Sequence, residues 1–170
     1  MNTPALSPEM SSARPDMTIV IRAATGLDDA TLGALVHGFY TKVRADPVLG
    51  PIFAARITDW GSHVERMLSF WSSVALMTGR YHGRPVPAHT SLPINAAHFD
   101  RWLQLFRQAA QEVCTPEGAA HAILRAERIA RSLQIAVAEA QAAPDAVPSL
   151  LFDERIPRWP TRLPSMMQQN

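Results

Sequence analysis

Apolar residues recur every three or four positions along four long stretches, and this spacing constrains the fold more than any other feature. The stretches cover approximately residues 25–45, 58–78, 95–113 and 116–141. Each has the period of an amphipathic helix with one buried face. The segment between the second and third stretches contains Gly83, Pro85, Pro87 and Pro93, which leaves room for one short helical turn at most. The pattern predicts an all-α fold.

The ends of these helices are marked by capping and breaking residues. Thr25, followed three positions later by Asp28, predicts a capping box at the start of the first helix. Gly50 with Pro51 predicts a tight turn after it, and Gly79 is expected to cap the end of the second helix. Thr115 followed by Pro116 predicts a capped start for the last helix.

The length of 170 residues suits one domain, which we expect over residues 23–140. Residues 1–22 form an N-terminal extension, expected to be partly disordered, and residues 141–170 form a proline-rich C-terminal extension. The formal net charge of +1 gives no field that would attract nucleic acid or a membrane. We expect a monomer or a weak dimer.

Several features predict a cytoplasmic protein. The single cysteine, Cys114, cannot form an internal disulfide, which fits a reducing compartment. The longest uncharged stretch of the folded region, residues 67–79, is shorter than the roughly 20 residues that a membrane span requires. The N-terminus lacks the basic start and long apolar centre of a signal peptide.

Three polar side chains fall on the apolar faces of the predicted helices: Tyr40, His63 and Trp102. A buried donor without a partner costs roughly 1 to 3 kcal/mol, so each needs an acceptor. Taken singly, each is explained by a bond to a nearby backbone carbonyl. Three together favour a polar site within an apolar core.

Of the six histidines, His89 is the candidate metal ligand. Prolines on both sides stiffen its segment between two long helices, which would fix the imidazole at low entropic cost. The alternative is an ordinary histidine in a proline-rich loop. The other four histidines outside the apolar faces are expected to be solvent-accessible: His37, His82, His98 and His121. No zinc-type pairing, phosphate-binding glycine loop or nucleophile elbow is present, which argues against hydrolytic chemistry.

The residues also carry a family signature over roughly residues 27–137. It comprises Phe39, Tyr40, Val43, Arg44, Asp46, the run 49–53, Trp60, His63, Phe70, Trp71, Tyr81, Gly83, Pro85, His89, Leu92, Pro93, Phe99 and Trp102. In order and spacing this resembles the truncated haemoglobins, and specifically their third group, since the paired glycines of the other groups are missing. The resemblance implies a 2-on-2 globin, in which two antiparallel helix pairs sandwich a haem and the proximal helix is reduced to about a turn.

The resemblance also implies the site residues. His89 corresponds to the proximal ligand of the iron in haem b, and Tyr40, His63 and Trp102 correspond to the distal polar positions. The implied haem contacts are Phe53, His63, Met67, Phe70, Trp71, Tyr81, His89, Phe99 and Trp102. Met67 is a departure, because a branched aliphatic residue is more usual there.

The function implied is reversible binding of O2, NO or CO at a five-coordinate iron, with Tyr40 and Trp102 stabilising a ligand that takes partial negative charge. Whether His63 donates a third bond or swings out as a gate is left open. One alternative is a haem enzyme that removes NO or peroxide; it would need a separate reductase, because no flavin or nicotinamide domain is visible. A remote alternative is a haem-free helical adaptor.

Overall fold

The computed structural model describes residues 14–143, which are helical with short connections and contain no strand. The helices are α1 (Pro15–Thr25), α2 (Asp29–Ala45), α3 (Leu49–Ala54), α4 (Trp60–Leu76), α5 (Pro85–Thr90), α6 (Ala96–Val113) and α7 (Pro116–Ala142). The all-α prediction is therefore confirmed. No helix of this part of the chain is long and apolar enough to cross a membrane.

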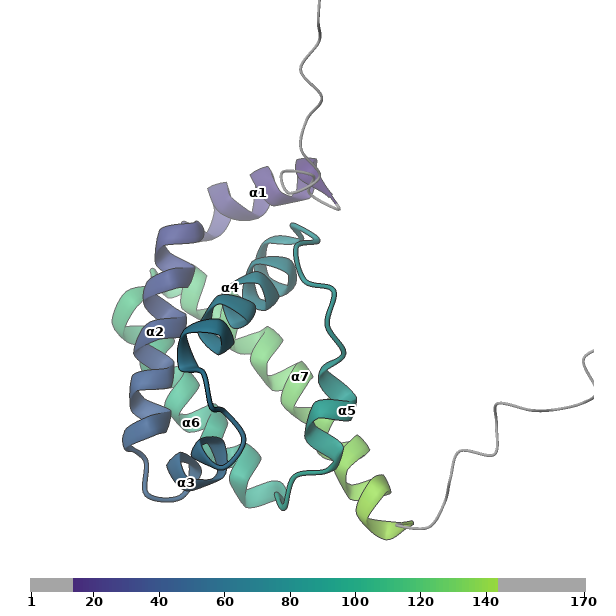
Figure 1. The fold of residues 1–170 in the computed structure, drawn as a ribbon. Coiled ribbons are helices and arrows are strands. Elements are labelled where there is room, and N and C mark those ends of the chain that lie inside the picture. Colours follow the sequence, from purple (N-terminus) through teal and green to yellow (C-terminus); the bar gives the residue numbers. More distant parts are fainter. Residues whose placement is uncertain (1–13, 144–170) are drawn as a thin grey trace, which may run out of the picture.

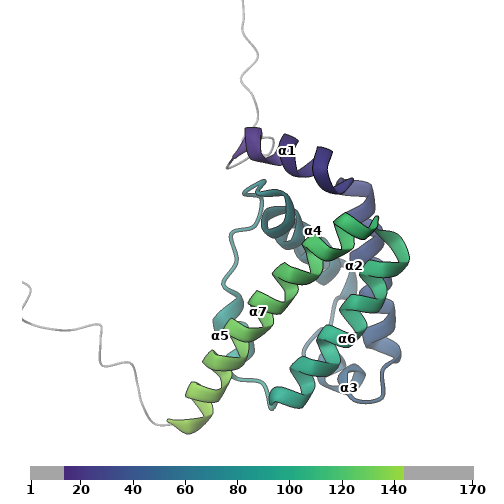
Figure 2. The ribbon, with the colours of Figure 1, turned by 180° about the vertical axis from the view of Figure 1, so that it is seen from behind.

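Two helix pairs make up the body of the molecule (Figure 1). In one pair α2 packs against α4, and in the other α6 packs against α7, with α2 and α6 in contact between them. Seen from behind, α7 runs obliquely beside the antiparallel α6 (Figure 2). The short α5 belongs to neither pair, and it packs against α7. This arrangement matches the two antiparallel helix pairs that the resemblance implies.

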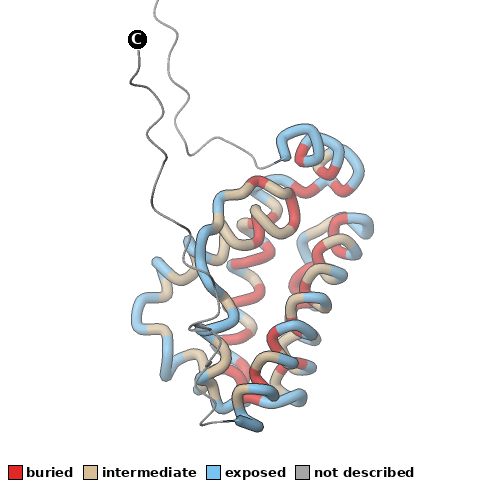
Figure 3. Tube along the Cα trace, turned by 90° about the vertical axis from the view of Figure 1, so that its right-hand side faces the viewer, coloured by how far each residue is buried: buried red, intermediate tan, exposed pale blue. Residues whose placement is uncertain are grey.

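Buried positions, red in Figure 3, alternate with exposed ones along the helices. Their side chains form two clusters. The larger cluster joins α2, α4, α6 and the first half of α7, around Phe39 and Phe106. The smaller one joins the segment after α5 to the start of α6 and the second half of α7, through Ile94, Phe99 and Leu133. Both α6 and the 27-residue α7 contribute buried side chains to the two clusters, so these helices connect both parts of the core.

Three predicted helix ends are wrong in detail. The first long helix starts at Asp29, because the side chain of Asp28 accepts the Thr31 N–H at 2.7 Å and caps it. The hydroxyl of Thr25 instead bonds the carbonyl of Ile21, at the end of the preceding α1. At the end of α4 the left-handed cap residue is Met77, with φ of 59°, rather than Gly79.

The third difference is at Gly50 and Pro51, where the sequence predicts a turn and the structure has α3. The carboxylate of Asp46 accepts the backbone N–H groups of Val48 and Leu49 at 3.0 and 2.9 Å, which starts the helix. Gly50 is required there, because a Cβ would lie 2.9 Å from the carbonyl oxygen of Arg44. By contrast, the capped start predicted at Thr115 and Pro116 is confirmed.

Both predicted domain limits fall within helices or near their ends. α1 crosses the expected boundary at residue 23, and the Thr18 hydroxyl of α1 donates to the carbonyl of Leu76 at 2.6 Å. At the other end, the Gln141 amide donates to the carbonyl of Ile94 at 2.9 Å. Partial disorder is expected from the sequence for residues 1–22; residues 14–22 are described, and residues 1–13 lie outside the described part of the chain, as does nearly all of the C-terminal extension.

Candidate functional site

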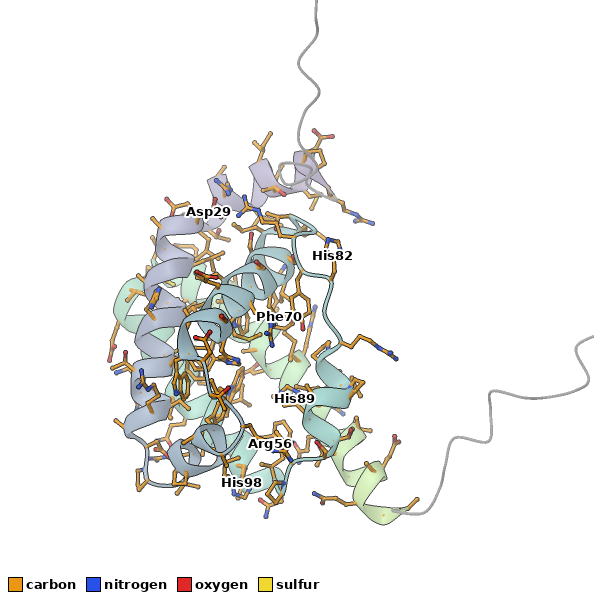
Figure 4. The ribbon with its side chains drawn as sticks, viewed as in Figure 1. Asp29, Arg56, Phe70, His82, His89 and His98 are labelled. Carbon is orange, nitrogen blue, oxygen red and sulfur yellow. The ribbon has the colours of Figure 1, made fainter. Side chains whose placement is uncertain are left out.

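The helix pairs and α5 enclose a cavity of about 460 Å³, a size typical of pockets for small molecules and cofactors. Side chains from α2 to α7 line it, and most of its wall is apolar or aromatic. Every site residue predicted from the sequence lies on this wall: Tyr40, Phe53, His63, Met67, Phe70, Trp71, Tyr81, His89, Phe99 and Trp102. Figure 4 shows His89 projecting from α5 toward the centre of the molecule.

His89 is held in one tautomer by the short helix that carries it. Pro85 begins α5, where its missing N–H is no loss, and its carbonyl lies 2.6 Å from Nδ1 of His89. A carbonyl can only accept, so Nδ1 carries the proton and donates. The Nε2 lone pair of His89 is then available to a metal ion, the arrangement usual for a metal-binding histidine. The hydrogen bond to the Pro85 carbonyl thus fixes the orientation of the His89 ring within the proline-rich segment.

Tyr40 and Trp102 both contact Phe39, which is almost completely buried. The Phe39 ring meets Tyr40 edge-on at 5.0 Å and Trp102 at 5.2 Å between ring centroids. Trp102 also stacks on Phe106 at 5.4 Å. Burial raises the pKa of the Tyr40 hydroxyl above its ordinary value of 10, so Tyr40 is a neutral donor at physiological pH.

His63 lies on α4 next to Tyr40, with ring centroids 5.0 Å apart. Its Nε2 atom is buried and has no hydrogen-bond partner among the described residues. Burial is the main cause that lowers the pKa of His63 below 6.5, followed by the charges of Arg66 and His89, so the neutral ring is favoured. An orphaned buried nitrogen on a cavity wall indicates a missing partner.

Sequence reasoning missed several wall residues, and two groups of them bear on what the cavity can hold. One is the second half of α7, where Ile129, Ala130 and Leu133 face the cavity; their helical spacing predicts a buried face but not whether protein or cavity covers it. The other is the charged pair Arg56 and Arg66, which line the cavity although both residues are exposed. These two arginines lie on different elements, and nothing in the local sequence around either one indicates that both reach the same cavity.

The remaining histidines match expectation in part. His37 and His82 are exposed, as predicted. His121 is half-buried instead, because its Nε2 donates to the carbonyl of Ala75 at 2.8 Å near the end of α4. His98 is also half-buried: it completes the cap at the start of α6 and lines the cavity. The contact of His121 joins elements far apart in sequence, whereas the cap made by His98 is local.

Among known proteins, the family model for bacterial-like globins matches residues 23–135. The chain belongs to the bacterial-like globin family. The globin is 33% identical over 113 residues to the group 3 truncated hemoglobin ctb of Campylobacter jejuni, covering 64% of this chain and 89% of that protein. It is 27% identical over 89 residues to the group 2 truncated hemoglobin YjbI of Bacillus subtilis, covering 51% and 67%.

A solved structure agrees with these relatives. The crystal structure of the group III truncated hemoglobin from Campylobacter jejuni superposes on the globin with a TM-score of 0.62 and 33% identity. The superposition covers 65% of this chain and 91% of the other. The resemblance to the third group of truncated haemoglobins is therefore confirmed, and the family implies a haem cofactor and a gaseous ligand such as O2.

Proposed function

We propose that this globin binds haem b through Nε2 of His89 and reversibly holds a diatomic ligand, O2, NO or CO, beside Tyr40, His63 and Trp102. The observation that carries the proposal is the Nδ1 contact of His89 with the Pro85 carbonyl, which frees Nε2 toward a cavity lined by aromatic side chains. When bound, the haem supplies an iron with one position open to a ligand.

The wall of the cavity suits haem in two further respects. Apolar side chains such as Phe53, Phe70 and Leu133 would pack against a porphyrin face. Arg56 and Arg66 on the same wall suit the two carboxylates of haem, and Arg56 is held near α5 by its bond to the Ser91 carbonyl at 3.1 Å. The cavity and the family membership both argue against a haem-free adaptor.

The residues near His63 would act on the ligand as donors in a site shielded from water. Tyr40 stays protonated, so its hydroxyl can donate to a partially negative ligand, and the Trp102 indole N–H is a donor only. The same donors would serve the alternative of NO or peroxide removal, which needs a separate reductase. Removal of NO or peroxide stays a prediction. So do the binding of haem b in particular and a cytoplasmic location.

The first test is the absorption spectrum of the full-length protein produced with sufficient iron and haem. We expect a Soret band, and an altered iron-coordination spectrum or loss of haem in His89→Ala. The matched control is His82→Ala, an exposed histidine on the same connection, which should leave the spectrum unchanged. A wild-type protein without haem, or a His89→Ala protein with an unaltered spectrum, would overturn the proposal.

The second test concerns the role of Tyr40. Tyr40→Phe should raise the O2 dissociation rate roughly ten- to a hundredfold, because a hydrogen bond to a charged partner contributes about 1.5 to 3 kcal/mol. Tyr81→Phe is the control, since it removes a phenol from a different part of the cavity wall. An unchanged dissociation rate in Tyr40→Phe, measured by stopped-flow ligand displacement, would refute the role of Tyr40.

A further inference from the structure

The first half of α4 covers the cavity and is less deeply buried than the second half, although several of its side chains pack against the core. From Trp60 to Phe70 every residue of α4 is exposed or half-buried, and the buried residues of this helix begin at Trp71. Yet His63, Met67 and Phe70 in this half line the cavity. Because this half contains no fully buried residue, it should open at a lower free energy than the second half, and contacts at its first turns should influence access to the cavity.

Among the contacts that hold these first turns is a group of three aromatic rings and one cation. Arg44 and Tyr40 lie one turn apart on α2, and Trp60 and His63 lie one turn apart on α4. Trp60 meets Tyr40 at 6.1 Å and His63 at 6.0 Å, both edge-on. The guanidinium carbon of Arg44 lies 4.7 Å from the Trp60 ring centroid, within the range of a cation–π contact.

We propose that Arg44 is a positioning residue: its cation on the Trp60 ring latches the first turns of α4 over the cavity and thereby limits how fast a ligand enters and leaves. Outward movement of these turns would separate Trp60 from Arg44 before His63 could leave the cavity. Arg44 itself does not line the cavity, so it acts only through Trp60. This inference rests on the proposed function for its kinetic part.

The kinetic test uses the full-length haem protein with CO as the probe. Arg44→Gln should raise both the CO association and dissociation rates about two- to fivefold, the factor expected for loss of an exposed cation–π contact, while the CO affinity stays within about twofold. Arg44→Lys, which keeps a cation, should restore rates near those of the wild type. Arg131→Gln, at an exposed arginine of α7, is the matched control.

A double variant distinguishes the contact between Arg44 and Trp60 from a general effect of positive charge at the end of α2. In a Trp60→Leu background, Arg44→Gln should change the CO rates no further, because the ring is already gone. If Arg44 acted only on the dipole of α2, its effect would persist in that background. Persistence there, or wild-type rates in Arg44→Gln alone, overturns the proposal.

Hydrogen–deuterium exchange gives a readout that does not depend on the iron. Arg44→Gln should accelerate amide exchange in residues 60–68 and leave exchange in α6 unchanged. A wild-type protein without a Soret band would refute the proposed function, while exchange would still test the latch. A normal Soret band with unchanged CO rates and unchanged exchange would refute the latch alone.

Discussion

Gly118 occupies the place where the start of α7 comes closest to the end of α1. A Cβ at this position would lie 2.8 Å from the carbonyl oxygen of Thr25 and 3.1 Å from the Thr115 hydroxyl. These two atoms already bond each other at 2.7 Å, so neither can move freely. The single hydrogen atom of the Gly118 side chain is therefore what lets α1 dock against α7.

Gly118→Ala should lower the free energy of unfolding by about 1 to 3 kcal/mol, because the added methyl group forces the two helices apart. The matched control is Gly38→Ala on α2, where no atom lies within 4 Å of the new Cβ. That substitution should stabilise the protein by about 0.5 to 1 kcal/mol, through the better helix propensity of alanine. Urea unfolding of both variants checks the prediction; equal effects would contradict it.

At the scale of elements, Asp46 joins the end of α2 to α3 and α6. Its side chain is 2% exposed and pairs with Arg101 of α6 at 2.5 Å, while its other oxygen caps α3. The bond from Arg101 is the main cause that lowers the pKa of Asp46 below 3.8. The folded state thus prefers the ionised carboxyl, and this contribution to stability is present above about pH 4 and lost as the pH falls further.

Asp46→Asn should therefore lower the unfolding free energy by about 1 to 2 kcal/mol at neutral pH, a range that allows for the partial exposure of Arg101. The difference from the wild type should shrink as the pH falls through the lowered pKa of Asp46, because the wild-type carboxyl then also becomes neutral. Thermal unfolding across this pH range measures it. Asp100→Asn, at an exposed neighbour on α6, should show no such pH dependence.

At the scale of the whole molecule, we expect the stability of the two core clusters to depend to different degrees on haem in the cavity. The larger cluster packs α2, α4, α6 and α7 directly against one another. α5 has no buried residue of its own, and it carries the one histidine proposed to bind iron. Removing the haem should thus release α5 first while the larger cluster stays folded.

We expect haem extraction to lower the melting temperature and to increase amide exchange most in residues 85–90 and least in α6. Ligation at His89 and contacts across the cavity stabilise only the loaded state. Exchange followed by mass spectrometry, before extraction and after haem is restored, measures the effect. Uniform loss of protection in α5 and α6 would show that the two parts unfold together.

Much of this architecture could be predicted from the sequence, because helical periodicity and proline placement are local signals. The polar side chains on apolar faces, Tyr40, His63 and Trp102, all line one cavity. What local signals could not supply were contacts between distant elements. Examples are the pairing of Asp46 with Arg101 and the approach of Arg56 and Arg66 to the same cavity.

The length of α7 determines where the C-terminus of this protein can be truncated without loss of contacts in the folded domain. The residues matched by the family model stop at 135, before the buried Val137 and before Gln141, whose amide bonds the Ile94 carbonyl. We therefore expect a truncated protein to need the residues up to Gln141 to keep these contacts. At the front it includes α1, so the sensible limits for truncation lie outside the recognised globin segment at both ends.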